Sequence, residues 1–298
     1  MSFERGSVML TGASGFIGRF VERALRARGY RVLPVEFDLF DEGARREWLA
    51  RHRPDHVLHL AWYTEHGKFW SAPVNADWVR MGREFFADFR RVARSGHSRF
   101  VAAGTVAEYD WGSIQSRPLT ESAPLRPGNF YGQCKHELRE ALVGDARDSG
   151  VTVVWGRVFW LYGPGENPAR LVAHAFARTL QGLPAEFTAG TQVRDFIHVS
   201  DLGEAFSALL DSDVSGAVNL ASGVAVSLRE VLEEIGRVTG RPELLHIGAK
   251  PVPAQDPPYL VADVTRMREE LKVHPRFRLA EGLRETWQWW QTQAGAHV

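Results

Sequence analysis

The sequence predicts an α/β fold with a doubly wound parallel sheet and a smaller C-terminal lobe. Short apolar segments alternate with helical patterns through the first half of the chain, and a glycine cluster follows the first of these segments. Such alternation implies parallel strands joined by right-handed crossovers, so that helices cover both faces of the sheet. Beyond about Gly163, repeated prolines interrupt longer loops between short helices, which indicates that the second lobe begins there.

The first half contains five segments with the apolar pattern of short buried strands. They are residues 7–11, 31–36, 56–60, 100–103 and 151–156. Between them, apolar residues recur with the 3.6-residue spacing of helices. This spacing covers residues 16–25, 44–51, 78–93 and about 130–142. Each predicted helix therefore connects two predicted strands, as a parallel sheet requires.

The predicted domain bounds are residues 1–163 for the sheet, with elements returning to it from about 194–221, and 164–298 for most of the second lobe. Within the second lobe, Ser227 and Glu230 have the spacing of a capping box at a helix start. The last helix carries an apolar stripe, which is typical of a packed core or a subunit contact. The stripe consists of Leu279, Leu283, Trp287 and Trp290.

The composition is that of a globular chain of 298 residues, of which 44% are hydrophobic and 24% charged. Thirty-six basic residues balance thirty-six acidic ones, so no net charge attracts nucleic acid or anionic lipid. No apolar run approaches the roughly 20 residues of a membrane span, and residues 1–5 open no secretory signal. The single cysteine can form no internal disulfide. We therefore expect a cytoplasmic protein that binds neither nucleic acid nor membrane.

Three glycines between the first strand and the first helix indicate a phosphate-binding turn. Gly12, Gly15 and Gly18 form a GxxGxxG pattern. A dinucleotide pyrophosphate is bound by N–H groups at a helix N-terminus, where the turn must lack Cβ atoms to approach the phosphate. Because a strand and a helix flank the motif, we predict a dinucleotide site rather than a tight turn without a ligand. The sheet is then a Rossmann domain.

Glu36 closes the second predicted strand at the distance from Gly12 where a carboxylate can accept the adenosine ribose hydroxyls. The same carboxylate would repel the 2′-phosphate of NADP, and no arginine follows it at once. The predicted cofactor is therefore NAD, with NADP as the alternative. A solvated carboxylate without a ligand is the other interpretation of Glu36.

Tyr131 and Lys135 are four residues apart on a predicted helix, so they share one helix face. An ammonium beside a phenol lowers the phenol pKa from its ordinary value of about 10, which allows proton exchange with a sugar hydroxyl or carbonyl. The pair predicts a tyrosine acid–base, although chance pairs also occur on surface helices. Cys134, between the two, is expected to pack as a buried thiol.

Together with further motifs, these residues make the chain resemble the extended short-chain dehydrogenase/reductases, specifically the NAD-dependent epimerase/dehydratase family that modifies nucleotide sugars. The motifs span nearly the whole chain, at residues 11–18, 54–61, 131–135, 162–165, 194–201 and 219–223. The resemblance implies hydride exchange between a sugar carbon and nicotinamide C4, with Thr105, Tyr131 and Lys135 as catalytic residues. Thr105 would bind the reacting sugar oxygen, Tyr131 would move the proton, and Lys135 would also hold the nicotinamide ribose.

The resemblance also implies which residues bind the two ligands. The cofactor-binding residues would be Gly12, Gly15, Phe16, Ile17, Gly18, Glu36, Asp38, Leu39, Leu60, Ala61, Trp62, Tyr131 and Lys135. The substrate-binding residues would be Thr105, Val106, Trp160, Arg170 and Arg194. In this assignment Arg194 matches an arginine that can clamp a nucleotide diphosphate through charge-assisted hydrogen bonds. A nucleotide sugar is thus the expected small-molecule partner.

Departures from the family pattern narrow the reaction and the substrate. A 4,6-dehydratase has an Asp-Glu pair directly after its threonine, whereas two aliphatic residues follow Thr105, so dehydration would lack its acid and base. Glu108 is acidic but is offset from that position. Trp160 replaces an asparagine that contacts substrate in the family. A second arginine is replaced around residues 253–256, and Arg170 is a candidate to supply its charge.

The second and third strands are joined by a short connection, which is similar to the deoxysugar 4-keto reductases. We therefore predict an NAD(P)-dependent nucleotide-sugar oxidoreductase, in the first place a 4-keto-deoxysugar reductase. One alternative is a nucleotide-sugar 4-epimerase, which uses the same three residues, and another is a non-catalytic protein that senses the dinucleotide. The resemblance also implies a homodimer through the helix that carries Tyr131 and the helix before it.

Several other polar side chains are predicted to be structural. His198 with Asp195 and Asp201 lacks the companion ligands of a zinc site, so no metal is expected. His56 and His59, at a buried strand, are expected to be satisfied by hydrogen bonds.

Overall fold

The computed structural model describes residues 5–33, 35, 37–113, 116–253 and 255–295 of the chain. Its largest sheet contains β1 (Ser7–Thr11), β2 (Arg31–Leu33), β3 (His56–His59), β4 (Arg99–Thr105), β5 (Thr152–Val158) and β9 (Gly216–Leu220). All six strands are parallel, in the order β2-β1-β3-β4-β5-β9. The strand order reverses between β1 and β3. In such sheets, ligands bind beyond the carboxyl ends of the strands at the reversal.

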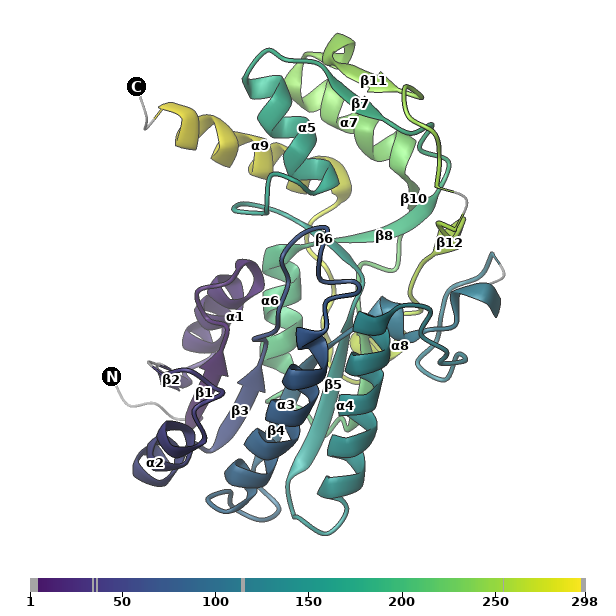
Figure 1. Ribbon diagram of the computed structural model, residues 1–298. Coiled ribbons are helices and arrows are strands. Elements are labelled where there is room, and N and C mark those ends of the chain that lie inside the picture. Colours follow the sequence, from purple (N-terminus) through teal and green to yellow (C-terminus); the bar gives the residue numbers. More distant parts are fainter. Residues whose placement is uncertain (1–4, 34, 36, 114–115, 254, 296–298) are drawn as a thin grey trace.

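Helices cover both faces of this sheet (Figure 1). They are α1 (Phe16–Ala27), α2 (Glu42–His52), α3 (Val74–Arg90), α4 (Phe130–Ala146) and α6 (Val199–Ala208). On one face α3 packs against α2 and α4, and on the other α1 packs against α6. This arrangement confirms the predicted α/β fold with a doubly wound parallel sheet.

The strands and helices predicted for the first half all occur, with ends that differ by a few residues. β4 continues past residue 103 because its parallel pairing with β5 extends to the pair Thr105 and Val158. The two additional residues bring Thr105 to the carboxyl edge of the sheet. β2 is described only as far as Leu33, and both Pro34 and Glu36 lie outside the described residues.

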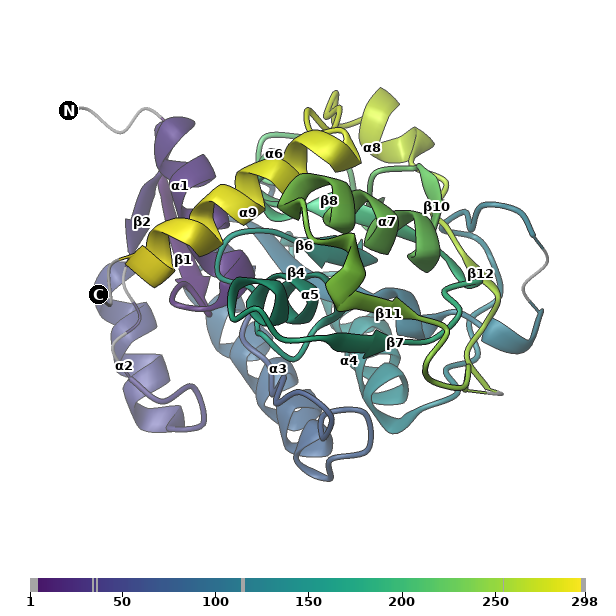
Figure 2. The same cartoon turned by 90° about the horizontal axis from the view of Figure 1, so that it is seen from above.

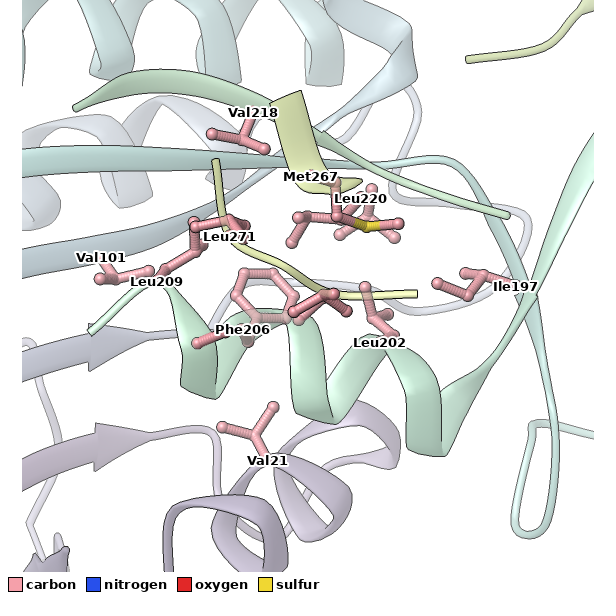
Figure 3. Packing of buried hydrophobic residues seen from close by; sticks show 14 of the residues in the cluster. Val21, Val101, Ile197, Leu202, Phe206, Leu209, Val218, Leu220, Met267 and Leu271 are labelled. Carbon is pink, nitrogen blue, oxygen red and sulfur yellow. The ribbon is translucent and has the colours of Figure 1, made fainter. Parts of the chain in front are cut away.

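A continuous hydrophobic core fills the space between α6 and the sheet. Leu202 and Phe206 of α6 belong to the same cluster as Val21 of α1 and Val101 of β4 (Figure 3). Met267, from the short helix α8 (Thr265–Glu269), is fully buried in this cluster. Because burial of such a side chain contributes about 1.5–3 kcal/mol, the core anchors a C-terminal segment to the sheet.

A second, smaller group of elements lies beyond the carboxyl ends of the strands, and we call it the C-terminal lobe (Figures 1 and 2). It contains α5 (Leu171–Leu180), β7 (Ala185–Phe187), α7 (Leu228–Thr239), β11 (Leu245–Ile247) and α9 (Leu279–Gly295). α7 packs against both α5 and α9, and β7 pairs in parallel with β11.

Two sequence features of the C-terminal lobe are confirmed. Ser227 caps α7 by accepting the Glu230 N–H at 3.1 Å, and the Glu230 carboxylate accepts the Ser227 N–H at 2.7 Å. The apolar stripe of α9 packs into a core between α5, α7 and α9, where Leu283 is fully buried. Of the two roles expected for the stripe, the structure supports the packed core.

A small mixed sheet lies between the two groups of elements. Its strands are β6 (Trp160–Tyr162), β8 (Val193–His198), β10 (Ala225–Ser227) and β12 (Tyr259–Leu260). The other three strands all pair with β8. The described part of the chain also contains the short 3-10 helices η1 (Val106–Glu108), η2 (Trp111–Ser113) and η3 (Pro242–Leu244). Within the described residues, no helix combines the length and the apolar character that crossing a lipid bilayer requires.

Candidate functional site

The predicted phosphate turn connects β1 to α1. Gly12 has a left-handed φ of 72°, and its carbonyl oxygen accepts the Gly15 N–H at 3.0 Å. Gly15 begins α1 without a side-chain cap, which leaves the first-turn N–H groups, including those of Phe16 and Ile17, for another acceptor. A Cβ on Gly18 would lie 2.0 Å from the Gly12 carbonyl oxygen, so the close approach of α1 requires glycine. Such an uncapped helix N-terminus can bind a phosphate group.

A cavity of about 410 Å³ lies beside this turn. Its walls include Gly12, Ala13, Ser14, Asp38, Leu39 and Trp78. Asp38 accepts the Phe40 N–H at 3.0 Å and places a carboxylate at the cavity wall. Glu36, which the sequence predicts to contact the ribose, lies outside the described residues. The uncapped helix, the glycine turn and the largely apolar wall fit an adenine dinucleotide.

The segment that follows β3 lies against the glycine turn. A Cβ on Gly12 would lie 2.9 Å from the Ala61 nitrogen and 3.2 Å from the carbonyl carbon of Leu60. The Ala61 N–H donates to the Thr11 hydroxyl at 3.2 Å. The structure therefore brings these predicted cofactor residues together with the turn.

Lys135 is buried between Trp62 and β4. Its Nζ donates to the Ala103 carbonyl oxygen at 2.9 Å and lies 3.7 Å from the centre of the Trp62 ring. Trp62 is held in this place because its indole N–H donates to Oδ1 of the buried Asn75 at 2.7 Å. The cation–π contact offsets only part of the lost hydration, and burial lowers the pKa of Lys135 to about 7.

Thr105 and Tyr131 meet at the carboxyl edge of the sheet. The Thr105 side chain accepts the Ala107 N–H at 3.3 Å and lies near enough to Tyr131 to lower the pKa of its phenol. Asn129 caps α4 by accepting the Gly132 N–H at 2.8 Å, which places Tyr131 in the first turn. A Cβ on Gly132 would lie 2.4 Å from the Ala107 carbonyl oxygen, so this glycine allows α4 to approach η1 (Val106–Glu108) closely.

The Tyr131 hydroxyl has a higher pKa than the sequence predicts. Desolvation raises its pKa to about 12, while the hydrogen bond from Thr105 and the charge of Arg170 act in the opposite direction. Lys135 Nζ lies 5.9 Å from the centre of the Tyr131 ring, and its own low pKa leaves the amine only partly charged at neutral pH. The expectation that an ammonium group lowers the phenol pKa is therefore wrong for this structure, because burial acts on both groups.

Two residues of η1 serve the fold. Glu108 is fully buried, and its Oε1 accepts the Thr105 N–H and the Trp155 indole N–H, both at 2.8 Å. Its Oε2 accepts the Arg157 Nε–H at 3.0 Å, so both carboxylate oxygens are used within the protein. The side chain of Val106, a predicted substrate contact, packs in the hydrophobic core.

Trp160 and Arg170 line a second cavity, of about 200 Å³, close to Tyr131. Phe69 and Trp70 form another wall of this cavity, and their ring centres lie 5.0 Å and 5.9 Å from that of Tyr131. Arg170 is the N-cap residue of α5. The structure therefore brings two predicted substrate residues to one cavity beside the predicted catalytic tyrosine.

Arg194 is buried and already paired. It forms an ion pair with Asp256, and its guanidinium donates to the Val193 carbonyl oxygen at 2.8 Å. The guanidinium also lies 4.9 Å from the centre of the Trp160 ring. Asp256 lies in the segment, residues 253–256, where the second arginine of the family is replaced. This segment thus supplies the counter-charge of Arg194. A ligand diphosphate would compete with Asp256 for Arg194.

The acidic residues near His198 do not converge on a common point. Asp195 accepts the Ser222 N–H at 2.8 Å, whereas Asp201 accepts the Arg276 N–H at 2.9 Å. The described residues contain no group of three or more side chains that could hold a metal ion.

The two histidines of β3 and the cysteine are buried, as predicted, but His59 is only partly satisfied, because its Nε2 atom has no hydrogen-bond partner among the described residues. His56 accepts the Arg99 N–H at 3.2 Å, and His59 is hydrogen-bonded to the Thr11 hydroxyl at 2.7 Å. Burial lowers their pKa values to about 4 and about 3, so both rings are neutral at pH 7. Cys134 is 2% exposed, and burial raises its pKa to about 11, which makes it a packed thiol.

Sequence reasoning missed two residues of this site. Asn75 gives no signal in the sequence, because its role depends on a side chain from another segment, Trp62. Glu166 is 5% exposed and lines the same cavity as Trp160. It directly follows the Tyr-Gly-Pro-Gly motif at residues 162–165. An acidic residue next to this motif was the sequence feature that could have indicated a site residue.

Comparisons with known proteins agree with the geometry. The sequence model of the "NAD dependent epimerase/dehydratase family" matches residues 8–221. The chain is 30% identical to a UDP-glucose 4-epimerase from Rhizobium leguminosarum bv. trifolii, over 95% of this chain and 97% of the relative. It is 29% identical to a dTDP-6-deoxy-L-talose 4-dehydrogenase (NAD(P)(+)) from Kitasatospora kifunensis, over 94% of each. A UDP-glucose 4-epimerase structure from Thermotoga maritima shares the fold, with a TM-score of 0.85, 22% identity, and coverage of 97% of this chain and 99% of that chain.

Proposed function

Since the chain belongs to the NAD-dependent epimerase/dehydratase family, we propose that it is an NAD(P)-dependent nucleotide-sugar oxidoreductase that reduces a 4-keto-deoxysugar. The observation that carries this proposal is the convergence of Thr105, Tyr131 and Lys135 at the carboxyl end of β4. Lys135 Nζ donates to the Ala103 carbonyl oxygen at 2.9 Å, and Tyr131 lies near enough to Thr105 for the threonine to lower the pKa of the phenol. The dinucleotide cavity and the cavity lined by Trp160 and Arg170 supply places for the two reactants.

NAD is the cofactor of the family, and when bound it supplies reversible hydride transfer at nicotinamide C4. The glycine turn would hold the pyrophosphate at the N-terminus of α1. Leu60, Ala61 and Trp62 connect this turn with Lys135, which would hold the nicotinamide ribose. The carboxylate of Asp38 at the cavity wall supports NAD over NADP, because it would repel a 2′-phosphate.

Tyr131 is the proposed proton donor. Its pKa of about 12 keeps the phenol protonated at neutral pH, which is the form that reduction of a carbonyl group requires. As the sugar carbonyl becomes a hydroxyl, the O–H bond of Tyr131 breaks, its proton joins the sugar oxygen, and the phenolate later regains a proton from solvent. Thr105 would donate a hydrogen bond to the same oxygen, and a protonated Lys135 would stabilise the phenolate.

A nucleotide-sugar 4-epimerase is the second candidate. The UDP-glucose 4-epimerase and the 4-dehydrogenase relatives are similar to the chain at 30% and 29% identity, so neither outweighs the other. An epimerase would use the same three side chains, with Tyr131 first accepting the proton and later returning it. The two functions differ in whether the reduced cofactor is consumed.

Incubation of the purified protein with dTDP-4-keto-6-deoxyglucose and NADH or NADPH tests the proposal. Stoichiometric oxidation of the reduced cofactor is the expected result. Interconversion of UDP-glucose and UDP-galactose without net oxidation would instead establish the epimerase. Tyr131→Phe should lower the turnover rate about 10²–10⁴-fold while dinucleotide binding persists. Unchanged turnover in this variant would contradict the proposed acid, and an unchanged cellular role without turnover would favour a sensing protein.

We also propose that the protein is a cytoplasmic homodimer. α3 and α4 pack side by side, and they are the helix pair that the family resemblance implies for the interface. Arg83 of α3 lies 3.9 Å from Asp145 of α4, so both signs of charge are present along this pair. A twofold axis could bring opposite charges of two copies together. A monomer in light scattering at micromolar concentration would contradict the dimer.

A further inference from the structure

The cavity beside Tyr131 contains a buried carboxyl group that the proposed reaction does not use. Glu166 lies in the loop between β6 and α5 and is 5% exposed. The backbone N–H of Ala173, in the first turn of α5, favours the ionised form of this carboxyl group. Its Oε2 atom is buried and has no hydrogen-bond partner among the described residues. A buried polar atom without a partner is unfavourable, so the position calls for an explanation.

The neighbours of Glu166 leave its carboxyl group unsatisfied. The charge of Arg170 favours the ionised form, but the described residues show no ion pair between the two side chains. Burial outweighs this charge and raises the pKa of Glu166 to about 8. Trp70 and Trp160 provide aromatic walls on other sides of the cavity. The cavity therefore combines aromatic walls with His66, Arg170 and the buried Glu166 as polar lining residues.

A sugar ring matches these surroundings. A hydroxyl group both donates and accepts hydrogen bonds, so it satisfies a carboxyl group in either protonation state. An anionic ligand group would be repelled by the ionised form of Glu166, and an apolar group would leave Oε2 unpaired. Aromatic walls suit the apolar C–H faces of a sugar ring, while a few placed polar groups fix its orientation.

We propose that Glu166 binds a ring hydroxyl of the sugar moiety and thereby contributes to sugar specificity. This role rests on the proposed function, because it requires a nucleotide-sugar substrate beside Tyr131. The alternative is that Glu166 serves only the structure of the loop before α5. In that case the affinity for the sugar part of the ligand would not depend on Glu166.

The two roles are separated by comparing a nucleotide sugar with its nucleotide. Calorimetry on the full chain in the presence of saturating NAD would give dissociation constants for UDP-glucose and UDP, and for dTDP-glucose and dTDP. Glu166→Met is expected to weaken binding of the nucleotide sugar about 10- to 100-fold and to change nucleotide binding less than about threefold. Glu166→Asp keeps a carboxyl group but withdraws it by one methylene, and it should weaken sugar binding about 3- to 10-fold. It serves as the test if the methionine variant does not fold.

Asn167→Ala is the matched control. Asn167 is exposed in the same loop, where its side chain accepts the Ala169 N–H at 2.9 Å, so the substitution perturbs the loop without removing a cavity group. It should leave the ratio of the two dissociation constants unchanged.

An unchanged ratio in a folded Glu166 variant would overturn the inference. Equal weakening of nucleotide and nucleotide sugar would also overturn it, since it would assign Glu166 to loop structure alone. If the wild-type protein bound none of the four nucleotides, the proposed function itself would fail, and this inference with it.

Discussion

Burial of Lys135 places this lysine in the candidate site but destabilises the folded protein. The side chain is 4% exposed, and its pKa falls from 10.5 to about 7. Between these two pH values the unfolded chain carries a proton on Lys135 that the folded chain lacks, so unfolding takes up a proton. The destabilisation is therefore complete below about pH 7 and disappears as the pH rises past 10.5.

Lys135→Met is expected to abolish turnover and yet to stabilise the free protein by about 1–3 kcal/mol near pH 6. The pKa shift sets an upper limit of about 5 kcal/mol, and loss of the bond to the Ala103 carbonyl and of the Trp62 contact reduces this gain. Urea unfolding near pH 6 and near pH 9.5 measures the effect. The gain in the free energy of unfolding should shrink at the higher pH. An equal gain at both pH values would show that the protonation of Lys135 is not its cause.

Glu108 is a second buried charge, and it has a structural rather than a catalytic role. Glu108→Ala leaves the fully buried guanidinium of Arg157 without its carboxylate, which should lower the free energy of unfolding by about 3–5 kcal/mol. Glu108→Gln keeps an acceptor for the Thr105 N–H and should cost less. Chemical denaturation of both variants measures the difference. Two equal losses would show that a neutral acceptor does not replace the carboxylate, and would contradict the expected smaller cost of Glu108→Gln.

At the residue scale, the motif predicted which side chains meet but not how they ionise. Thr105 lies near enough to Tyr131 to lower the pKa of its phenol, as expected for two residues of one site. The pKa of Lys135 depends on burial under Trp62, whose position is fixed by Asn75 from α3. The four-residue spacing of Tyr131 and Lys135 does not show that Trp62 packs over Lys135. For this reason the direction of the tyrosine pKa shift could not be predicted.

At the scale of elements, two glycines in different helices provide a substitution and its matched control. A Cβ on Gly18 of α1 would lie 2.0 Å from the Gly12 carbonyl oxygen, whereas a Cβ on Gly144 of α4 meets no atom within 4 Å. Gly18→Ala must displace α1 from the turn, which should cost about 1–3 kcal/mol and weaken NADH binding. Gly144→Ala should stabilise the protein by about 0.5–1 kcal/mol, because alanine favours the helix.

Urea unfolding and fluorescence titration with NADH measure both effects. Gly144→Ala should leave NADH affinity unchanged, since α4 is altered only on its exposed side. If Gly18→Ala bound NADH as tightly as the wild-type protein, the close approach of helix and turn would not be needed for the cofactor.

The elements themselves were predictable because strand and helix periods alternate so regularly in the first half. Their ends were less predictable, since they depend on pairing. β4 extends to Thr105 because β5 continues beside it, and β2 pairs with β1 over only three residues, Arg31 to Leu33. The capping box at Ser227 was predictable because both of its partners lie within one turn.

At the scale of the whole molecule, the candidate site joins segments that are distant in the sequence. Phe69 and Trp70 follow β3, Tyr131 begins α4, and Glu166 precedes α5, yet three of these four line one cavity and Tyr131 adjoins it. Alternating patterns predict a sheet edge where such segments gather. They do not predict the cavity, because its walls combine the segment after β3 with β6, β8 and the start of α5.

Asp195 links these distant parts and provides a test of how they fold together. It is fully buried in β8, and its carboxylate accepts the Ser222 N–H and hydroxyl at 2.8 Å and 2.6 Å, the Gly223 N–H at 2.9 Å and the Ala262 N–H at 3.3 Å. The amide nitrogen in Asp195→Asn cannot accept the last two N–H groups, and each buried donor without a partner costs about 1–3 kcal/mol.

Asp195→Asn should therefore lower the free energy of unfolding by about 2–5 kcal/mol while the protein still unfolds in one transition. The single transition is expected because β8 pairs with β6, β10 and β12 at the junction between the large sheet and the C-terminal lobe. Asp77→Asn, which removes an exposed ion pair with Arg80, is the control and should change stability by less than about 0.5 kcal/mol. Denaturation followed by circular dichroism and by tryptophan fluorescence measures both variants. Separate transitions from the two signals in Asp195→Asn would show that the lobe unfolds independently of the sheet, and that Asp195 does not couple them.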